Sequence, residues 1–475
     1  MNKTLVNLLN PIQLTSQQEL AFATIKSFID NKDAKFLKFS GAAGTGKSTL
    51  ISQVLFWLKN EHSDLNLAVA SPTNKALRNI RLMANKALNT DASEYFSFYT
   101  LAQILGYYLD ISIYTGKDYL TNGNRTKQQR ICEYDLVIID EYSMIDERLL
   151  KDIINAIHNT QTKVLFCGDP FQLPPVKAAR PPVCALDIEE ITLFDVVRYD
   201  GELAVVAEEI RSNDTYQKLP YPFESSDDGT IVKYEREISW KKAAERYFQD
   251  DAFVADKNSV RFLAYTNKRC EDLSSYVRNA LYGMEAAQGN PYLPNDLLIA
   301  KAPVYRKGSN DSYEQIANNS QEFLVVEPGV LLIDEDTGYK YWSVVAEPID
   351  VEDNASITLK ILNEDSALAN EKNISKLQSK LQRTRNYGDR IALTKKIDNT
   401  RKAFDNVVYA YAITVHKSQG STFERVFVDV EDTYKSNITQ KLLYTAITRA
   451  SLSISVYGDF SFDEEDQIDL ETLFD

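Results

Sequence analysis

The chain has 475 residues, and its 53 Lys and Arg residues against 68 Asp and Glu residues give a formal net charge of −15. Hydrophobic residues make up 44% and charged residues 25%, which is ordinary for a globular protein and excludes a disordered chain or a fibre. At ~100–200 residues per domain, the length allows roughly two to four domains, each large enough to bury a core.

Targeting and redox signals are weak. No apolar run approaches the ~18–20 residues that span a bilayer, and residues 1–11 lack the basic and apolar regions of a secretory signal. The four cysteines are scattered and only three His residues occur. We therefore expect no disulfide framework, no zinc site, no membrane association and a reducing, cytoplasmic location.

Charge is distributed unevenly along the chain. Seven acidic residues lie in the last fifteen positions, whereas residues 371–403 hold ten basic residues and three acidic ones. The whole-chain charge therefore excludes no partner, because local charge decides which ligands a surface attracts. We expect residues 461–475 to form a solvated, disordered acidic tail; docking on a basic replication protein or mimicry of DNA is the alternative.

Short apolar runs alternate with stretches of helical spacing in two parts of the chain, and each run ends at a polar or glycine-containing turn. This rhythm predicts two α/β units, each with a parallel sheet covered on both faces. The runs lie at residues 36–39, 65–70, 136–139, 164–167, 260–265, 407–413, 426–430 and 454–458.

Three segments interrupt the alternation. Residues 106–123 alternate around Thr115-Gly116, which predicts a β-hairpin. Several short strand signals between residues 295 and 362 suggest a small inserted β-barrel, and residues 371–403 suggest an antiparallel helix pair with basic faces. The expected boundaries are 1–105 and 125–185 for the first α/β unit, 106–124 for the hairpin, 186–294 and 405–460 for the second α/β unit, 295–404 for the barrel with its helical extension, and 461–475 for the acidic tail.

The strongest local motif is the complete pattern G-x-x-x-x-G-K-S at residues 41–48. Its glycines let the loop curl so that backbone N–H groups face phosphates, Lys47 supplies a cation for the β- and γ-phosphates, and the Ser48 hydroxyl can bind Mg²⁺. An ordinary glycine-rich turn is the alternative, but the pattern follows a predicted strand and opens a predicted helix. The expected nucleotide contacts in the loop are Gly44, Thr45, Gly46, Lys47, Ser48 and Thr49.

An apolar run at residues 136–139 ends in two acids. At the end of a strand, Asp140 can hold Mg²⁺ and Glu141 can orient or deprotonate an attacking water. Acids after strands also occur as helix caps. Their position about ninety residues after Lys47 favours hydrolysis of ATP or GTP.

Further stretches complete an ordered set. The sequence has Leu14-Thr15-x-x-Gln18 before the phosphate loop, and residues 71–76, 168–176, 414–422 and 443–450 after it. Together with residues 140–144, these resemble the motifs of superfamily 1 DNA helicases, in the 5′-to-3′ RecD-like branch and closest to the bacteriophage Dda-like helicase. The resemblance covers nearly the whole chain, including residues 317–326.

The resemblance implies an α/β fold with two tandem RecA-like P-loop NTPase domains, an inserted β-hairpin pin and an inserted SH3-like β-barrel with a helical extension. Gln18 would read the adenine edge, Gln172 would sense the γ-phosphate, and Gln419 and Gly420 would couple the nucleotide to DNA. Arg449 and Arg198 would act as arginine fingers from the second domain, with Arg211 as the alternative to Arg198. The implied catalytic residues are Lys47, Asp140, Glu141, Gln172, Arg198 and Arg449.

The same resemblance implies which residues face DNA. Hydroxyls, amides and a neutral imidazole suit a phosphodiester track that is gripped without sequence readout. Tyr114, near the hairpin tip, would stack on the last base pair, or the hairpin is a plain surface element; His416 is alternatively a buried structural residue. The implied DNA contacts are Pro72, Thr73, Thr100, Tyr114, Thr266, Asn267, Thr414, His416 and Ser418.

The sequence thus predicts a monomeric, ATP- and Mg²⁺-dependent DNA helicase that moves 5′ to 3′ on single-stranded DNA and unwinds forks. Its direction rests on the resemblance alone. A single-strand-binding protein or replisome component is a further expected partner, in the cytoplasm of a bacterial or phage-infected cell. An RNA helicase of the same superfamily, or a nucleotide-dependent DNA-binding switch without unwinding, is the alternative.

Overall fold

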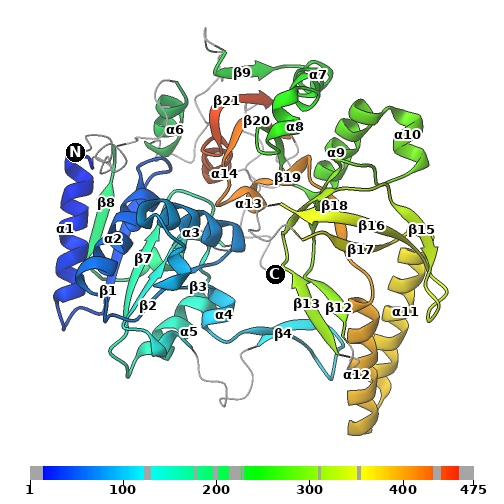
Figure 1. Ribbon diagram of the computed structural model, residues 1–475, viewed down its shortest axis with the longest axis horizontal. Helices are drawn as coiled ribbons and strands as arrows, with labels where there is room; N and C mark the ends of the chain where they lie inside the picture. Colours follow the sequence, from blue (N-terminus) through cyan, green and yellow to red (C-terminus); the bar gives the residue numbers. More distant parts are fainter. Residues whose placement is uncertain are drawn as a thin grey trace, which may run out of the picture. The chain divides into compact units, whose positions relative to one another are not determined.

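The computed structural model describes residues 14–121, 130–175, 178, 180–195, 202–212, 226, 229–308, 312–349, 355–431 and 440–458 (Figure 1). The chain divides into two compact units. The first consists of Met1–Tyr107 and Asn122–Ala204, and the second of Tyr108–Thr121 and Val205–Asp475. Arg198 and the acidic tail at residues 461–475 lie outside the described residues.

The first unit is built on a parallel sheet whose strand order is β3-β2-β6-β7-β1-β8. Its central strands are apolar and buried along their length, as expected where helices cover both faces. Two hydrophobic clusters lie on opposite faces, one against α1, α2 and α3 and the other against α4 and α5. The first α/β unit predicted from the sequence is therefore confirmed. The elements are α1 Ser16–Asp30, β1 Phe36–Gly41, α2 Lys47–Glu61, β2 Leu67–Ser71, α3 Asn74–Leu88, β3 Ser97–Thr100, α4 Leu101–Ile104, β6 Leu136–Ile139, α5 Glu147–Ile157, β7 Lys163–Gly168 and β8 Glu190–Leu193.

The boundary expected after Ala185 is wrong. Strand β8 pairs in parallel with β1, with Lys38 opposite Glu190, so the first unit continues beyond that position. Only Leu193 of this four-residue edge strand is buried. The strand was missed because a half-exposed edge strand has no continuous apolar pattern.

The second unit contains another parallel sheet, in the order β19-β10-β20-β21-β9. Aromatic side chains fill its core: the Trp240 and Phe262 ring centroids are 4.8 Å apart, and the Trp240 indole N–H donates to the Ser455 carbonyl at 3.1 Å. The second predicted α/β unit is therefore also confirmed, except that Val407–Tyr409, which was expected in it, pairs with the inserted antiparallel sheet. Its elements are β9 Ile231–Tyr234, α7 Glu237–Phe248, α8 Asp251–Ala255, β10 Val260–Ala264, α9 Asn267–Tyr282, α10 Met284–Gly289, β19 Ala412–Thr414, α13 Val415–Ser418, β20 Phe423–Asp429, α14 Gln440–Ile447 and β21 Ala450–Tyr457; α6, Glu202–Ser212, spans the division between the units.

An antiparallel sheet is inserted between the two halves of this second α/β fold, in the order β15-β16-β14-β11-β18 with β17 paired to β16. It has its own core around Leu298, Phe323 and Val344. The run of short strands expected there is thus present. The strands are β11 Leu297–Ala300, β14 Glu322–Val325, β15 Val330–Ile333, β16 Lys340–Pro348, β17 Ile357–Leu362 and β18 Val407–Tyr409, and a separate hairpin consists of β12 Val304–Lys307 and β13 Tyr313–Ala317.

A helix pair lies between the last two strands of the inserted sheet in the sequence and holds a hairpin from much earlier in the chain. The helices α11, Glu364–Arg383, and α12, Tyr387–Lys402, pack together, and the hairpin consists of β4, Tyr108–Ile111, and β5, Asp118–Thr121 (Figure 1). The Gly116 carbonyl accepts from Gln378 at 2.9 Å and from Arg401 at 3.0 Å. Ile111 joins a small buried cluster with Leu377, Leu381 and Ile397.

None of the helices within the described ranges is both long and apolar enough to cross a membrane.

Comparing two loops of the second unit shows how much the hairpin turn depends on its packing against the helix pair. Gly116 and Gly338 have φ of 65° and 72°, and each donates its N–H over four residues, to Ser112 and Asp334 respectively, at 2.8 Å. A Cβ on Gly116 would lie 3.0 Å from an Ile397 methyl, whereas a Cβ on Gly338 would meet nothing within 4 Å.

Gly116→Ala should therefore destabilise its hairpin more than Gly338→Ala destabilises its own, by ~1–3 kcal/mol. Both variants carry the backbone strain of a left-handed residue, but only Gly116→Ala also overpacks against α11 and α12. The measurement is amide hydrogen exchange in the two loops. Equal losses would show that the hairpin turn gains nothing from the helix pair.

Candidate nucleotide site and phosphate-facing strand ends

The phosphate loop connects the buried end of β1 to the first turn of α2. Gly44 and Gly46 have φ of 81° and 84°, in the left-handed region that glycine adopts without strain. The Lys47 ammonium donates to the carbonyls of Gly41 at 2.7 Å and Ala42 at 2.8 Å. The loop thus combines a helix N-terminus with a cation, an arrangement that suits the binding of phosphates. The predicted residues Gly44, Thr45, Gly46, Lys47, Ser48 and Thr49 all lie in this segment.

Gln18 lies against the phosphate loop. Its side-chain oxygen accepts from the Thr15 N–H at 3.0 Å, and its side-chain nitrogen donates to the Thr45 carbonyl at 3.0 Å. The first contact belongs to the capping box that begins α1, and the second joins this helix to the loop. The structure therefore places Gln18 beside the loop that was predicted to bind nucleotide, and the role in reading adenine stays a prediction.

Asp140 and Glu141 follow the buried strand β6. Asp140 is 7% exposed, and burial raises the pKa of its carboxyl to about 7, with a further rise from Glu141 and an opposing effect of Lys47. Glu141 has φ of 54°, an uncommon conformation for a residue with a side chain, of the kind that clusters at functional sites. The ordinary surface cap considered from the sequence does not describe Asp140, because its carboxyl is buried.

Gln172 is 3% exposed and follows the next strand, β7. Its side-chain nitrogen donates to Asp169 at 3.3 Å, but within the described residues its buried oxygen has no hydrogen-bond partner. A buried polar atom without a partner is costly and often marks a site that receives a ligand or water. The oxygen can accept a hydrogen bond from a water, which suits a residue that responds to hydrolysis.

Asp169 was not singled out from the sequence. It is fully buried, accepts from the Phe171 N–H at 3.0 Å and holds the Gln172 amide. The sequence could have indicated this residue, because Asp169 follows the end of β7 just as Asp140 follows the end of β6.

The donor set fits a magnesium ion that is held mostly by its ligand and by water. The described residues contain no group of three or more His, Cys, Asp or Glu side chains that could hold a metal. The Ser48 hydroxyl and the Asp140 carboxylate are hard oxygen donors, and Mg²⁺ commonly takes one or two such protein ligands together with phosphates and waters. A cation would also favour the ionised form of the buried carboxyl.

Four threonines cap the elements that follow four parallel strands, two in each unit. Each hydroxyl accepts from the backbone N–H three residues on, at 3.1–3.3 Å. In each sheet the two strands are neighbours: β2 and β3 in the first, β10 and β19 in the second. The two units therefore repeat one arrangement at equivalent ends of their sheets. The four residues are Thr73, Thr100, Thr266 and Thr414, all of them predicted DNA contacts.

The other predicted strand contacts have different settings. Pro72 is half-buried before the Thr73 cap, and Asn267 is exposed at the start of α9. His416 is half-buried with its ring 6.0 Å from that of Tyr265, and burial lowers the pKa of its imidazole, which favours the neutral form. The prediction for the Ser418 side chain is wrong, because this residue is fully buried and its hydroxyl donates to the Val415 carbonyl at 2.7 Å.

Arg449 is held inside the second unit. It is 5% exposed, and its guanidinium donates to the Ser421 carbonyl at 3.2 Å and to the Thr448 hydroxyl at 3.1 Å. Gly420, with φ of 75°, lies next to that carbonyl in the sequence. The structure thus brings together two of the residues predicted to respond to nucleotide. Arg211, the alternative to Arg198, forms an ion pair with Glu208 in the last turn of α6.

Tyr114 lies at the hairpin turn in the second unit. Its side chain is 66% exposed, and the Arg390 guanidinium lies 5.3 Å from the ring centroid. Arg390 also donates to the Ile113 carbonyl at 3.2 Å. An exposed ring on a braced turn is free to stack on a planar partner.

Asp140→Asn should remove a pH dependence of stability from the protein measured without metal. The folded-state pKa of about 7 lies above the ordinary value of 3.8 for an aspartate, so the proton stabilises the folded state below about pH 4, and this stabilisation is lost as the pH rises through about 7. At ~1.4 kcal/mol per pKa unit, the difference is on the order of a few kcal/mol. Urea unfolding of both proteins in EDTA, from about pH 5 to pH 8, measures it. Parallel stability curves would contradict the burial effect.

The sequence of the chain matches known protein families. Residues 26–178 match a model described as an AAA domain, and residues 409–457 match the UvrD-like helicase C-terminal domain. The RecD subunit of the RecBCD enzyme from Buchnera aphidicola subsp. Schizaphis graminum is 24% identical over 483 residues, which are 95% of this chain and 75% of that protein. An uncharacterized protein of Acanthamoeba polyphaga mimivirus is 24% identical over 92% of this chain and 98% of its own length.

A solved structure supports the fold independently. The Pif1 helicase from Candida albicans superposes with a TM-score of 0.50 over 96% of each chain, at 18% sequence identity. Both α/β units are therefore RecA-like domains. The matched family models, the RecD relatives and this fold together make the chain similar to superfamily 1 helicases of the branch that contains RecD and Pif1.

Proposed function

We propose that the chain is an ATP-dependent DNA helicase that moves 5′ to 3′ on single-stranded DNA and unwinds duplex DNA. The observation that carries the proposal is the convergence, in one compact unit, of a complete phosphate loop, the buried Asp140 beside the strained Glu141, and the Gln172 oxygen, which has no partner among the described residues. These groups have the chemistry required for hydrolysis of a nucleoside triphosphate. Relatives that match about a third of the chain include the ATP-dependent DNA helicases RecD2 and PIF1, which supports DNA over RNA as the substrate.

Each residue of the site has a separate task in hydrolysis. Lys47 neutralises phosphate charge, while Ser48 and Asp140 would hold Mg²⁺, which supplies further charge neutralisation when bound. Glu141 orients the attacking water or accepts its proton. The Gln172 oxygen accepts a hydrogen bond from that water, so that the buried amide responds to the state of the nucleotide.

Strand binding relies on the threonine caps that both units repeat. A hydroxyl that accepts from a capped N–H also carries a hydrogen that can be donated to a phosphate oxygen. Such contacts read no base edges, so they allow a strand to be held and released at any sequence. Each of the two compact units has one such pair of threonines. The chain can therefore contact a strand at two places.

The hairpin at Tyr108–Thr121 is proposed to be the wedge, with Tyr114 as the ring that meets the last base pair. The inserted antiparallel sheet is proposed to be the SH3-like barrel, and α11 and α12 its helical extension. Support comes from the exposure of Tyr114 and from the hydrogen bonds of Gln378, Arg390 and Arg401 to the turn. A wedge must resist displacement, which a braced turn does better than a free one.

Several expectations stay predictions: a monomeric state, a single-strand-binding protein or replisome component as partner, a cytoplasmic location in a bacterial or phage-infected cell, and particular closeness to Dda-like helicases. A role in replication, repair or recombination agrees with the RecD and Pif1 relatives.

The decisive experiment is unwinding of forks that differ only in overhang polarity. We expect ATP-dependent strand separation with a 5′ overhang and little with a 3′ overhang, and we expect Lys47→Ala to abolish both hydrolysis and unwinding, because the phosphate charge loses its partner. Equal unwinding from both overhangs would contradict the direction. Hydrolysis stimulated by single-stranded DNA without strand separation would favour the nucleotide-dependent switch, and stronger stimulation by RNA would favour an RNA helicase.

Arg449→Ala should lower kcat far more than it weakens ATP binding. An arginine that stabilises transition-state charge contributes ~10³–10⁵ in rate in related phosphoryl-transfer systems. Arg449→Lys keeps the charge but loses the planar fork that donates to Ser421 and Thr448, so it should recover only part of the rate. Steady-state hydrolysis and nucleotide titration separate the two effects. Normal kcat in Arg449→Ala would exclude the finger assignment.

A further inference from the structure

A row of exposed cations runs along one face of α11. The row consists of Lys372, Lys376, Lys380 and Arg383, all of them exposed and spaced four, four and three positions apart. Residues at these spacings are neighbours on a helix surface. Across the part of the chain that the structure describes, none of the four forms an ion pair. We call this set the α11 row.

The α11 row is unfavourable for the helix that carries it. No acidic residue lies three or four positions before or after any of its members, so at these spacings the only charged neighbours of each cation are other cations. Like charges at these spacings destabilise a helix. On α12, in contrast, Lys402 pairs with Asp398 at 2.7 Å. The helix therefore carries a local repulsion that an anionic ligand would relieve.

The helix dipole does not account for the α11 row. Cations are favourable near a helix C-terminus, but the effect falls off within the last turn. Lys380 and Arg383 lie in the last turn of α11, whereas Lys372 and Lys376 lie two to three turns from its end. Half of the row is thus beyond the reach of this stabilisation.

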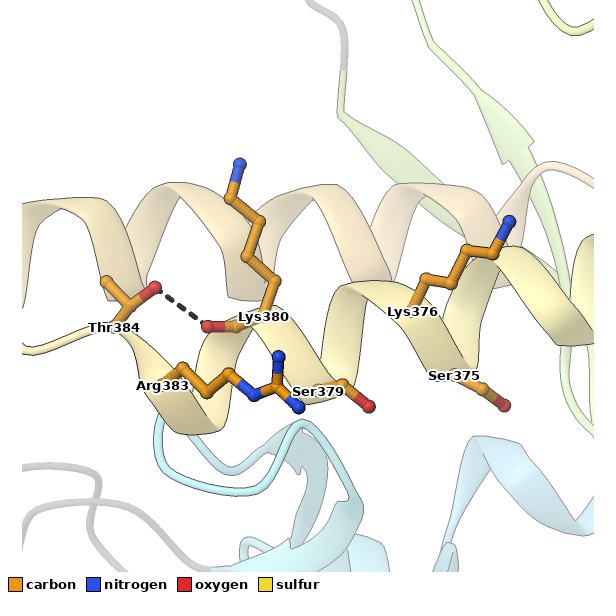
Figure 2. Close-up of a pocket in the computed structure, with 6 residues that line it drawn as sticks. All are labelled: Ser375, Lys376, Ser379, Lys380, Arg383 and Thr384. Atoms are coloured by element: carbon orange, nitrogen blue, oxygen red, sulfur yellow. Dashed lines mark hydrogen bonds between the residues drawn. The ribbon is translucent and has the colours of Figure 1, made fainter.

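A hollow lies along the same helix. Its volume is about 500 Å³, and Figure 2 shows that Lys376 and Lys380 project from one side of α11, with Ser375, Ser379 and Arg383 beneath them. The Thr384 hydroxyl donates to the Lys380 carbonyl at 2.8 Å. The lining therefore consists of cations and hydroxyls, with no aromatic or aliphatic residue. Its six residues are Ser375, Lys376, Ser379, Lys380, Arg383 and Thr384.

This chemistry is that of phosphate recognition. Lys, Arg and Ser contact the phosphate oxygens of nucleic acids and fix position without reading sequence. Single strands are usually held with the help of stacked aromatic side chains, which the hollow lacks. A duplex carries one negative charge per ~1.7 Å, and the row spans about 16 Å of helix, so a duplex backbone offers it a dense line of anions.

We propose that the α11 row binds the phosphate backbone of duplex DNA. The choice of duplex DNA rests on the proposed helicase function, because Gln378, on the opposite side of α11 from Lys376 and Lys380, holds the hairpin turn proposed to split the duplex. The row would keep the unopened duplex next to that turn. It differs in position and chemistry from the threonine caps, which end parallel strands.

The test compares the binding of a short blunt duplex and of a single strand of the same length, without nucleotide, by fluorescence anisotropy over a series of salt concentrations. The test variant is Lys376→Gln/Lys380→Gln/Arg383→Gln. A matched control, Lys32→Gln/Lys242→Gln/Arg246→Gln, removes the same charges from exposed positions elsewhere. A charge-conserving variant, Lys376→Arg/Lys380→Arg/Arg383→Lys, tests whether charge or helix packing matters.

The log–log salt slope for duplex binding should decrease in magnitude by about 2 to 3 in the test variant, since each lost phosphate contact contributes ~0.9. The control and the charge-conserving variant should retain the wild-type slope. The proposal is overturned by an unchanged duplex slope, by an equal loss in the control variant, by a loss in the charge-conserving variant, or by a loss confined to the single strand. Hydrolysis and unwinding by the wild-type protein test the proposed function separately, because duplex binding is measured without nucleotide.

Discussion

Parallel pairing gathers the carboxyl ends of neighbouring strands at one edge of a sheet, and the candidate chemistry depends on this constraint. In the first unit, the phosphate loop follows β1, Asp140 follows β6 and Gln172 follows β7, and these three strands are consecutive in the sheet order β6-β7-β1. Residues far apart in the sequence thus meet because their strands are adjacent. The threonine caps follow β2 and β3 at the same edge.

Burial determines the ionisation of Asp140, which follows the end of β6. A carboxyl at a surface would ionise without cost, but Asp140 is nearly enclosed and burial raises the pKa of its carboxyl. A nearby cation then changes the ionisation of the group more strongly than it would in water. The cost of keeping this polar group buried is offset by the wholly apolar strand β6 before it.

Buried ion pairs connect the second α/β sheet to its antiparallel insertion. Arg261 on β10 contacts Glu322 on β14 at 3.0 Å, and Arg278 on α9 contacts Asp296 at 3.0 Å, with all four side chains almost fully buried. Removing one partner of such a pair leaves an uncompensated buried charge, which costs ~3–5 kcal/mol. The pairs therefore disfavour alternative packings of the insertion as well as its detachment.

Local patterns made much of the site predictable from the sequence. Contacts between residues far apart in the sequence could not be predicted in this way. The phosphate loop and Asp140-Glu141 are encoded in short stretches whose backbone and side chains act together. Gln18 was named only through the family resemblance, and its contact with the loop spans 27 positions in the sequence. The burial of Ser418 depends on packing, and β8 is too short and too exposed to be distinguished from a loop.

The position of the hairpin affects how the protein could be divided into fragments. It is encoded between two segments of the first unit, yet its apolar residue Ile111 packs with Leu377, Leu381 and Ile397 of the second. A fragment that stops at the end of the first unit would retain Ile111 without those neighbours. A fragment that begins after Ala204 would lack the segment that covers Leu381 and Ile397. Neither unit is therefore a self-sufficient piece of sequence, although each is compact in space.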